Sequence, residues 1–483
     1  MPSQSFAETR IPGANTVVEQ ACRQKLAQLY PAGIPEFASE RLELELAYAK
    51  ASPNMQDNLE IYRRISLEAL RAGLFLTLRG SAPGSFLYYL LGNFPMNPLP
   101  AHYYCPECGH YELAGGDLAG IDLPEKRCPA CSAVMRSDGF NIRPEMVFGL
   151  NGEKKIEAEY NATEELFPFF RKILTEAFPG CSVEILGMPC LREDDNTTAF
   201  EHSGFVILPE GRTPSDYPEI SGYLKDGTPC ILYSGPEIWK EEIQRVLIYP
   251  HKTIKRLIAL QRATGHFITD IALNDLRPVR WTDYANTGIY PDWTEFAIRD
   301  LRPGTFTEMV CLEAASHHAI ASGEGYTPEN KHDYQTLINF FNSEEVKKYP
   351  CFTRDDFFET FLALGLPRET AYKMTFAVRT GQAHLRKRQW PEMADAAALP
   401  EELRRLCEKY LYAWMRSQAS VNTLLGAMMA YYMRMDSRTY SSVLNTVRCA
   451  YSGAAEPPFR KNEYRESGAA YRRYQMFNEK LLS

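Results

Sequence analysis

Apolar residues recur at helical spacing in several parts of the chain, with charged residues between them. Ser39–Leu46 and Asn58–Ser66 are the first such stretches, and each predicts an amphipathic helix that packs one face on a core. Helical patterns dominate again from about residue 251 onward. The helices predicted there are Thr253–Arg262, Asp355–Leu364, Arg368–Val378, Pro400–Trp414 and Val421–Met435.

Apolar runs of another kind lie between these helical regions. Leu74–Leu78 predicts a buried strand that enters a small-residue turn over residues 79–86, after which Leu87–Leu91 resumes an apolar element. In the middle of the chain, short runs such as Gly204–Leu208 and Pro229–Tyr233 alternate with turn residues and predict strands. The region around residue 80 therefore predicts a strand–turn–helix unit.

Length and composition exclude several classes of protein. The 483 residues suggest two to four domains, and 45% hydrophobic with 24% charged residues is a globular balance that excludes whole-chain disorder, collagen and coiled coil. With 61 acidic and 53 basic residues the formal net charge is −8, which does not support a large nonspecific DNA-binding surface. A local basic groove for nucleic acid stays compatible with this total.

The chain carries no pattern typical of a membrane span or a secretion signal. The longest apolar stretch near the C-terminus, Val421–Met433, has only 13 residues and is too short to cross a bilayer. The N-terminus has no basic segment followed by an apolar one. We therefore expect a cytoplasmic protein without a membrane partner, in which most of the 12 cysteines stay reduced.

Four cysteines form the most specific motif in the chain. Cys105 and Cys108 make one Cys-x-x-Cys pair, Cys128 and Cys131 make another, and 19 residues separate the two pairs. Each pair can present two thiolates on one turn, so the two turns complete a tetrahedral four-sulfur site for Zn²⁺. Because all four positions are then filled, the motif predicts a structural zinc ion; the alternative is four unligated thiols.

Two further motifs are less specific. The turn that begins with Arg79, Gly80 and Ser81 offers backbone N–H groups and hydroxyls at an expected helix N-terminus, an arrangement that holds phosphate. The alternative is a tight connection that needs glycine only for its backbone geometry.

Glu157 and Glu159 stand at i and i+2, so on a strand both carboxylates lie on one face and could share a divalent metal ion. The alternative there is an ordinary solvated strand face.

The order of these motifs carries a resemblance that none of them carries alone. Arg79-Gly-Ser, Asn97-Pro-Leu-Pro-Ala-His-Tyr, the two Cys-x-x-Cys pairs and Glu157-Ala-Glu follow one another with characteristic spacing. In this order the chain resembles the palm of the bacterial C-family replicative DNA polymerases, the PolC-type alpha subunit of DNA polymerase III. Downstream segments resemble the fingers of that family: Arg302–Phe306 with Ser316-His317, Cys351–Gly381, and Tyr410–Arg448.

The resemblance implies a fold of the α+β class, with a mixed-sheet polymerase palm, a zinc-ribbon insertion and a mainly helical fingers domain. The implied boundaries are residues 1–104 for the N-terminal part of the palm, 105–131 for the zinc ribbon, 132–250 for the C-terminal part of the palm with a reduced thumb, 251–450 for the fingers and 451–483 for a polar tail. The thumb is reduced because much of it is missing between about Glu184 and Thr197.

The resemblance also implies roles for particular residues. Glu157 and Glu159 stand where the family has two aspartates that bind Mg²⁺ for phosphoryl transfer. The residues implied to contact phosphate or nucleotide are Arg79, Gly80, Ser81, Ser316, His317, Arg416 and Gln418. The implied partners are primer–template DNA, a deoxynucleoside triphosphate (dNTP) and other replication proteins.

The chain departs from the family pattern at the residues that catalysis needs most. Each glutamate is one methylene longer than the aspartate it replaces, and Mg²⁺ tolerates little displacement of its ligands. The third metal-binding aspartate of the family aligns with Leu247, which cannot ligate a metal. On the helix expected to contact the nucleotide, Arg416 keeps a cation, whereas Gln418 and Asn422 replace the histidine and tyrosine of the family.

These departures favour a DNA- or nucleotide-binding pseudoenzyme linked to DNA replication, with weak or absent nucleotidyl transfer. Two alternatives stay open. In the first, the chain is an active minimal DNA polymerase in which Glu157 and Glu159 bind the metal ions and Glu241 or Glu242 replaces the missing third carboxylate. In the second, it is a protein–protein interaction module that has lost contact with DNA, which the acidic net charge fits.

Two basic runs contain aromatic residues between the cations. They are His384–Trp390 and the tail segment Phe459–Tyr474. This combination suits phosphate contact together with base stacking. The alternative is solvated helix ends and a polar tail without a ligand.

Overall fold

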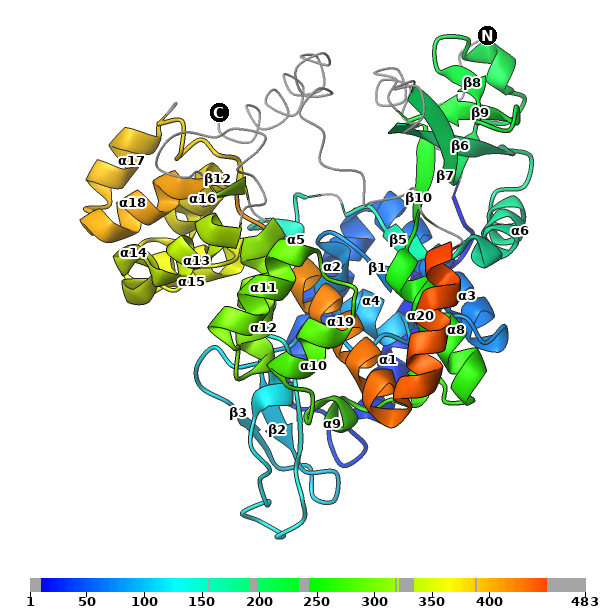
Figure 1. Ribbon diagram of the computed structural model, residues 1–483. Coiled ribbons are helices and arrows are strands. Elements are labelled where there is room, and N and C mark those ends of the chain that lie inside the picture. The colour runs from blue at the N-terminus through cyan, green and yellow to red at the C-terminus, as the bar shows by residue number, and fades with distance from the viewer. Residues whose placement is uncertain are drawn as a thin grey trace.

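The computed structural model describes residues 10–154, 156–191, 198–233, 243–317, 319–320, 334–386 and 389–449. It contains one mixed sheet of seven strands, two small sheets and helices along most of the chain, so the predicted α+β class is confirmed (Figure 1). Helices fill the middle of the molecule, and a three-stranded sheet and the far end of the seven-stranded sheet project from them in different directions (Figure 1).

Three helices and a strand–turn–helix unit open the described chain. The helices are α1 (Ala14–Leu29), α2 (Glu36–Ala51) and α3 (Pro53–Arg71), and the last two contain the helices predicted in this region. The unit that follows consists of β1 (Thr77–Leu78), the 3-10 turn η2 (Ala82–Gly84) and α4 (Phe86–Leu91), which confirms the predicted order. The predicted strand is shortened to two residues because only these pair with a neighbouring strand.

A small sheet inserted after this unit holds the four-cysteine motif. Its strands are β2 (His102–Tyr104), β3 (Tyr111–Leu113) and β4 (Arg136–Asp138), which are antiparallel in the order β3-β2-β4. The 3-10 turn η3 (Gly120–Asp122) lies between the two cysteine pairs, and α5 (Pro144–Phe148) follows the sheet.

Seven strands form the large sheet in the order β1-β5-β10-β7-β6-β9-β8. Those after β1 are β5 (Glu159–Ala162), β6 (Ser182–Leu191), β7 (Thr198–Leu208), β8 (Ser221–Tyr223), β9 (Pro229–Leu232) and β10 (Gln244–Pro250). β5 pairs with β1 antiparallel and with β10 parallel, so the sheet is mixed as predicted. The helix α6 (Phe167–Ala177) connects β5 to β6, and β6 and β7 carry the sheet away from the helices (Figure 1). The segment implied to hold a reduced thumb begins within β6, and its residues 192–197 lie outside the described residues.

Helices dominate the described chain after β10. They are α8 (Lys252–Thr264), α9 (Leu273–Leu276), α10 (Trp281–Asn286), α11 (Asp292–Leu301), α12 (Phe306–His317), α13 (Tyr334–Asn342), α14 (Glu344–Lys348), α15 (Arg354–Ala363), α16 (Arg368–Arg379), α17 (Trp390–Ala396), α18 (Glu401–Lys409), α19 (Arg416–Met435) and α20 (Ser437–Cys449). The helix predicted over Pro400–Trp414 is wrong at its end, because β12 (Tyr410–Tyr412) pairs there with β11 (Ala319–Ile320). The buried Tyr410 hydroxyl donates to the Cys351 carbonyl at 2.6 Å and draws the chain out of the helix.

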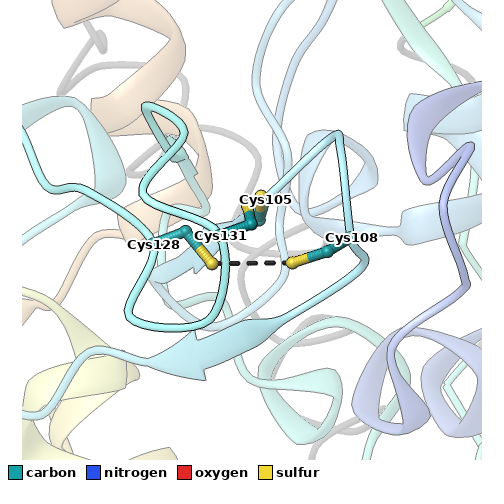
Figure 2. Close-up of side chains that lie close together, drawn as sticks. All are labelled: Cys105, Cys108, Cys128 and Cys131. Carbon is teal, nitrogen blue, oxygen red and sulfur yellow. Dashed lines mark hydrogen bonds between the residues drawn. The ribbon is translucent and has the colours of Figure 1, made fainter.

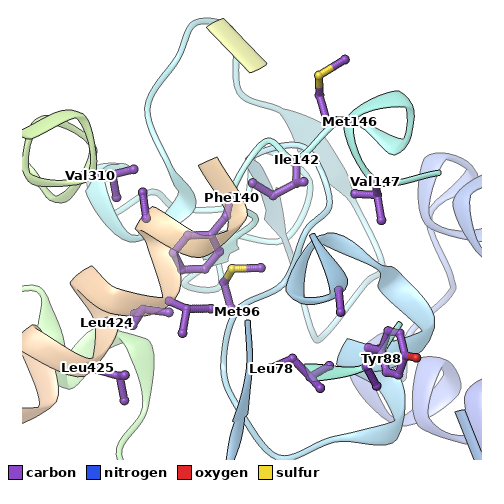
Figure 3. Close-up of a cluster of buried hydrophobic side chains, with 14 of the residues drawn as sticks. Leu78, Tyr88, Met96, Phe140, Ile142, Met146, Val147, Val310, Leu424 and Leu425 are labelled. Atoms are coloured by element: carbon purple, nitrogen blue, oxygen red, sulfur yellow. The ribbon is translucent and has the colours of Figure 1, made fainter. Parts of the chain in front are cut away.

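The helix α19 runs through the middle of the molecule and is buried on most sides. Its residues Leu424 and Leu425 pack in one cluster with Met96, Phe140 and Val310, which come from three other parts of the chain (Figure 3). The apolar stretch near the C-terminus is therefore a core helix. No helix in the described part of the chain is long and apolar enough to cross a membrane.

A buried ion pair fixes the turn between β1 and α4. Glu45 on α2 is fully buried and accepts from the guanidinium of Arg41 at 2.5 Å, from the Ser85 hydroxyl at 2.7 Å and from the amide of Phe86 at 3.0 Å. The same guanidinium donates to the Gly84 carbonyl at 2.9 Å. A carboxylate at the first turn of a helix satisfies amides that have no partner inside the helix.

Close packing between β7 and β10 depends on Gly204. This residue lies opposite Leu247 in the antiparallel pair and has a φ of 133°. A Cβ atom on it would lie 1.9 Å from the Val246 carbonyl oxygen. Only glycine allows both this backbone conformation and this approach of the two strands.

We predict that Gly204→Ala lowers the free energy of unfolding by about 3 kcal/mol or more, because backbone strain adds to a clash with a carbonyl group. Urea unfolding of the intact chain measures the change. Gly211→Ala is the matched control, since Gly211 has a φ of 74° but a Cβ there meets nothing within 4 Å. Gly211→Ala should lower the free energy of unfolding by about 1 kcal/mol. Equal losses of stability in the two variants would contradict the role of the clash.

Candidate functional site

The four cysteines of the motif converge on one point in the small sheet (Figure 2). The Sγ atoms of Cys105 and Cys131 are 3.4 Å apart, those of Cys108 and Cys128 are 3.5 Å apart, and all four lie within 4.8 Å of one another. A tetrahedral zinc ion with Zn–S bonds of about 2.3 Å separates its sulfur ligands by about 3.8 Å. The donor set and its spacing therefore fit a structural zinc ion.

Both cysteine pairs adopt the same backbone turn. The amide of Cys105 donates to the carbonyl of residue 110 and its carbonyl accepts from the amide of residue 109. Cys128 makes the corresponding bonds with residues 133 and 132. Two equivalent turns presenting two thiolates each are the arrangement of a zinc ribbon.

Glu157 and Glu159 lie next to each other at the edge where β5 begins, and each pairs with an arginine. Two nitrogens of the Arg245 guanidinium donate to one carboxylate oxygen of Glu157, at 2.7 and 3.2 Å. Arg79 Nε lies 3.5 Å from a carboxylate oxygen of Glu159, and its guanidinium stacks on the Tyr249 ring at 3.9 Å. The strand that was expected to carry both glutamates is β5. It starts at Glu159, so Glu157 lies before the strand.

The charges of the two glutamates and their two arginine partners cancel. Burial raises the pKa of the Glu159 carboxyl, Arg79 opposes this effect and the neighbouring Glu157 adds to it. Two carboxylates and two guanidinium groups sum to zero, so the site offers a divalent cation no excess negative charge. A metal ion at either glutamate would share that carboxylate with an arginine.

Leu247 occupies the place beside Glu159 on the neighbouring strand. The parallel register of β5 and β10 sets these two residues side by side, and Arg245 lies two positions earlier on the same face of β10. Leu247 is 2% exposed and packs with an apolar cluster that includes Val206 and Ile231. Within the described residues, no third acidic or histidine side chain joins the two glutamates in a group that could hold a metal. Glu241 and Glu242 lie outside the described residues.

The turn of Arg79, Gly80 and Ser81 is held by the first turn of α19. Gly80 has a φ of 69°, its amide donates to Gln418 Oε1 at 2.5 Å, and its carbonyl accepts from the Ser417 hydroxyl at 3.0 Å. The amide implied to bind phosphate therefore has an internal partner. Ser81 Oγ accepts from Lys154 Nζ at 2.8 Å.

Gln418 and Asn422, which the resemblance aligned with a histidine and a tyrosine, form a hydrogen-bonded chain. Gln418 Nε2 donates to Asn422 Oδ1 at 2.9 Å, and Asn422 Nδ2 donates to Glu313 Oε1 at 3.0 Å. Both amide orientations are fixed, because a backbone N–H can only donate to Gln418 and a carboxylate can only accept from Asn422. The chain connects α12, α19 and the turn at Gly80.

Ser316 and His317 lie at the end of α12, close to this hydrogen-bonded chain. The buried Ser316 hydroxyl donates to the Glu313 carbonyl at 2.9 Å. The His317 ring stacks on the Trp414 ring, with centroids 4.2 Å apart and planes inclined by 15°. The predicted contact of Ser316 and His317 with nucleotide stays a prediction. Of these two residues, His317 is the more exposed to solvent.

Arg416 is buried at the start of α19. Its guanidinium pairs with Asp356 and donates to the Asn141 carbonyl at 2.9 Å. Burial opposes the charged form, but Asp356 and Asp355 outweigh it and raise the pKa of Arg416. In this arrangement the guanidinium anchors helices, and its predicted contact with nucleotide stays a prediction.

Three further cations gather behind Ser81, and the motifs did not single them out. They are Lys154, Arg354 and Arg379, with Asp355 as the facing acid. Burial, Arg354 and Arg379 together hold the pKa of Lys154 well below its usual range. Arg354 lies in the segment Cys351–Gly381 that carries the resemblance, but only folding brings it close to Lys154.

The basic run His384–Trp390 is partly paired within the chain. Arg386 forms an ion pair with Glu408 at 2.7 Å, and His384 Nδ1 lies 2.7 Å from the Glu408 carbonyl. Residues 387 and 388 and the tail segment Phe459–Tyr474 lie outside the described residues.

Comparison with known proteins finds PolC-type DNA polymerase III proteins. The chain is 22% identical to that of Caldanaerobacter subterraneus over 91% of its own length, 24% identical to that of Thermotoga maritima over 87%, and 24% identical to that of Bacillus subtilis over 91%. In each case the chain spans 34% of the length of the relative. No protein-family model matches the chain.

We predict that the purified chain holds about one zinc ion, and that Cys105→Ser loses it and lowers the free energy of unfolding by about 3 kcal/mol or more. Metal analysis and urea unfolding measure the two effects. Cys181→Ser is the control, because Cys181 lies outside the motif and should leave the zinc content unchanged. Equal zinc content in wild type and Cys105→Ser would contradict the four-sulfur site.

Proposed function

We propose that this chain, a divergent relative of the PolC-type DNA polymerase III proteins, is a DNA- or nucleotide-binding pseudoenzyme with a role linked to DNA replication. Residues 1–104 and 132–250 form its palm, the second part with a reduced thumb, residues 251–450 form its fingers, and residues 105–131 form a zinc ribbon. The similarity over about 90% of the chain supports this assignment. Nucleotidyl transfer is weak or absent.

Leu247 is the observation that carries the proposal. Two-metal phosphoryl transfer needs several carboxylates around the same ions, and a buried leucine beside Glu159 supplies none. The two remaining glutamates are neutralised by Arg79 and Arg245. If Mg²⁺ bound at all, Glu157 and Glu159 would hold it, and it would supply charge stabilisation for a phosphate group.

Cations at the other side of the turn support binding of a phosphate-bearing ligand. Lys154 donates to Ser81, while Arg354 and Arg379 lie close enough to shift its pKa. Lys154, Arg354 and Arg379 lie near one another, with Asp355 as a nearby acid. The phosphates of a dNTP or of primer–template DNA would pair with these basic groups.

The two alternatives predict different behaviour. An active minimal polymerase needs a third carboxylate near Glu159, which Glu241 or Glu242 would have to supply. A protein–protein module would bind neither DNA nor nucleotide. The basic groups behind Ser81, Lys154, Arg354 and Arg379, favour a ligand with phosphate groups over that module.

We predict that the purified chain gives at most trace extension of a primed template with dNTPs and Mg²⁺ or Mn²⁺, while it binds the same DNA in a salt-dependent way. The double variant Glu157→Ala/Glu159→Ala should bind DNA at least as tightly as wild type does, because it leaves Arg79 and Arg245 without their acids. Glu164→Ala/Glu165→Ala, which removes two nearby exposed acids, is the matched control. Substantial extension that only the first double variant abolishes would contradict the proposal and favour the active polymerase.

We also predict that dNTP binding strengthens as the pH falls toward the lowered pKa of Lys154, because this lysine must take up a proton to pair with phosphate. Titration calorimetry at several pH values measures the change. Lys154→Met should weaken binding about tenfold and remove this pH dependence. Lys172→Met, an exposed lysine on α6, should change neither, and an unchanged pH profile in Lys154→Met would count against the role of Lys154.

A further inference from the structure

The first turn of α12 is held by a residue from the zinc ribbon. The hydroxyl of Thr305 caps the helix locally by accepting from the Glu308 amide at 3.0 Å. The amides of Phe306 and Thr307 donate instead to the two carboxylate oxygens of Asp122, at 2.6 and 2.8 Å. The first amides of a helix have no partner inside it, and an anion there also complements the helix dipole.

The position of Asp122 depends in turn on the ribbon. It ends η3, in the segment between Cys108 and Cys128, and the four sulfurs close this segment into a loop. Metal binding removes conformational freedom from a loop that it closes. Near Asp122, the amide of Ala119 donates to the Thr307 hydroxyl at 2.9 Å, so two residues of the loop contact α12.

The other end of α12 reaches the candidate site. Glu313 accepts from Asn422, which continues through Gln418 to the amide of Gly80. In the middle of the helix, Val310 packs in the same apolar cluster as Phe140, which follows the last strand of the ribbon sheet (Figure 3). A displaced α12 would therefore disturb the contact that holds the turn at Gly80.

We infer that the zinc ribbon sets the position of α12, with Asp122 as the positioning residue, so that metal loading controls how firmly the Arg79-Gly80-Ser81 turn is held for its ligand. The ligand in this statement rests on the proposed function, whereas the effect on α12 does not. Zinc thus acts on the site through a helix cap that belongs to a distant part of the sequence.

Hydrogen–deuterium exchange of the full chain tests the inference. Asp122→Ala should accelerate exchange over residues 306–317 roughly tenfold while the zinc content stays unchanged. Removal of zinc from the wild type with a chelator should accelerate exchange in the same helix. Asp122→Asn should restore part of the protection, because its amide oxygen still accepts one of the two helix amides.

Asp216→Ala is the matched control, since Asp216 caps a 3-10 turn (Pro214–Asp216) beyond β7 and should leave α12 unchanged. Unchanged exchange of α12 in Asp122→Ala, or equal acceleration of α12 and α20, would overturn the inference. If Asp122→Ala does not fold, Thr307→Val removes only the hydroxyl contacts and should give a smaller acceleration.

A DNA-binding titration separates the inference from the proposed function. Asp122→Ala should bind primer–template DNA several-fold more weakly than wild type, and Asp122→Asn should recover part of that loss. A wild type that binds no DNA or dNTP while α12 still responds to zinc would contradict the proposed function and support the positioning role.

Discussion

The buried ion pair between Arg41 and Glu45 is the contact on which the arrangement of the site depends. Glu45 satisfies the first turn of α4, and Arg41 reaches the carbonyl of Gly84, so the pair determines where the turn after β1 lies. A buried charge without its partner is strongly unfavourable, which makes the two residues inseparable. From the opposite side α19 holds the same turn through Gln418. The turn is thus fixed by helices that lie far apart in the sequence.

The register of β5 and β10 decides what the fixed turn faces. It sets Leu247 beside Glu159 and Arg245 within reach of Glu157, and Arg79 comes from the turn itself. Carboxylates paired with guanidinium groups satisfy one another without a metal ion. The same scaffold therefore holds a neutral group where a two-metal enzyme would carry negative charge. This arrangement is the basis of the proposed ligand-binding role.

The zinc ribbon contacts the helix α12, which is linked through α19 to the turn at Gly80. Its cysteines need only each other and a metal ion, so their spacing in the sequence was enough to predict the cluster. Its effect on α12 could not be predicted in this way, because Asp122 and Thr307 are 185 residues apart in the sequence. Arg416 shows the same limit. Its position in the family pattern suggested a contact with nucleotide, whereas its ion pair with Asp356 becomes visible only after folding.

The sequence by itself determined the features that depend on neighbouring residues. The four-cysteine cluster, the strand–turn–helix unit at Gly80 and the helices of the C-terminal half follow local spacing and hydrophobic periodicity, which act over a few residues. The tertiary structure decided which charges meet. The pairs of Glu157 with Arg245 and of Ser81 with Lys154, and the shortening of the predicted helix at Tyr410, depend on strand register and on burial. Those quantities are set by the packing of the whole chain, because only packing removes water and brings distant residues within bonding distance.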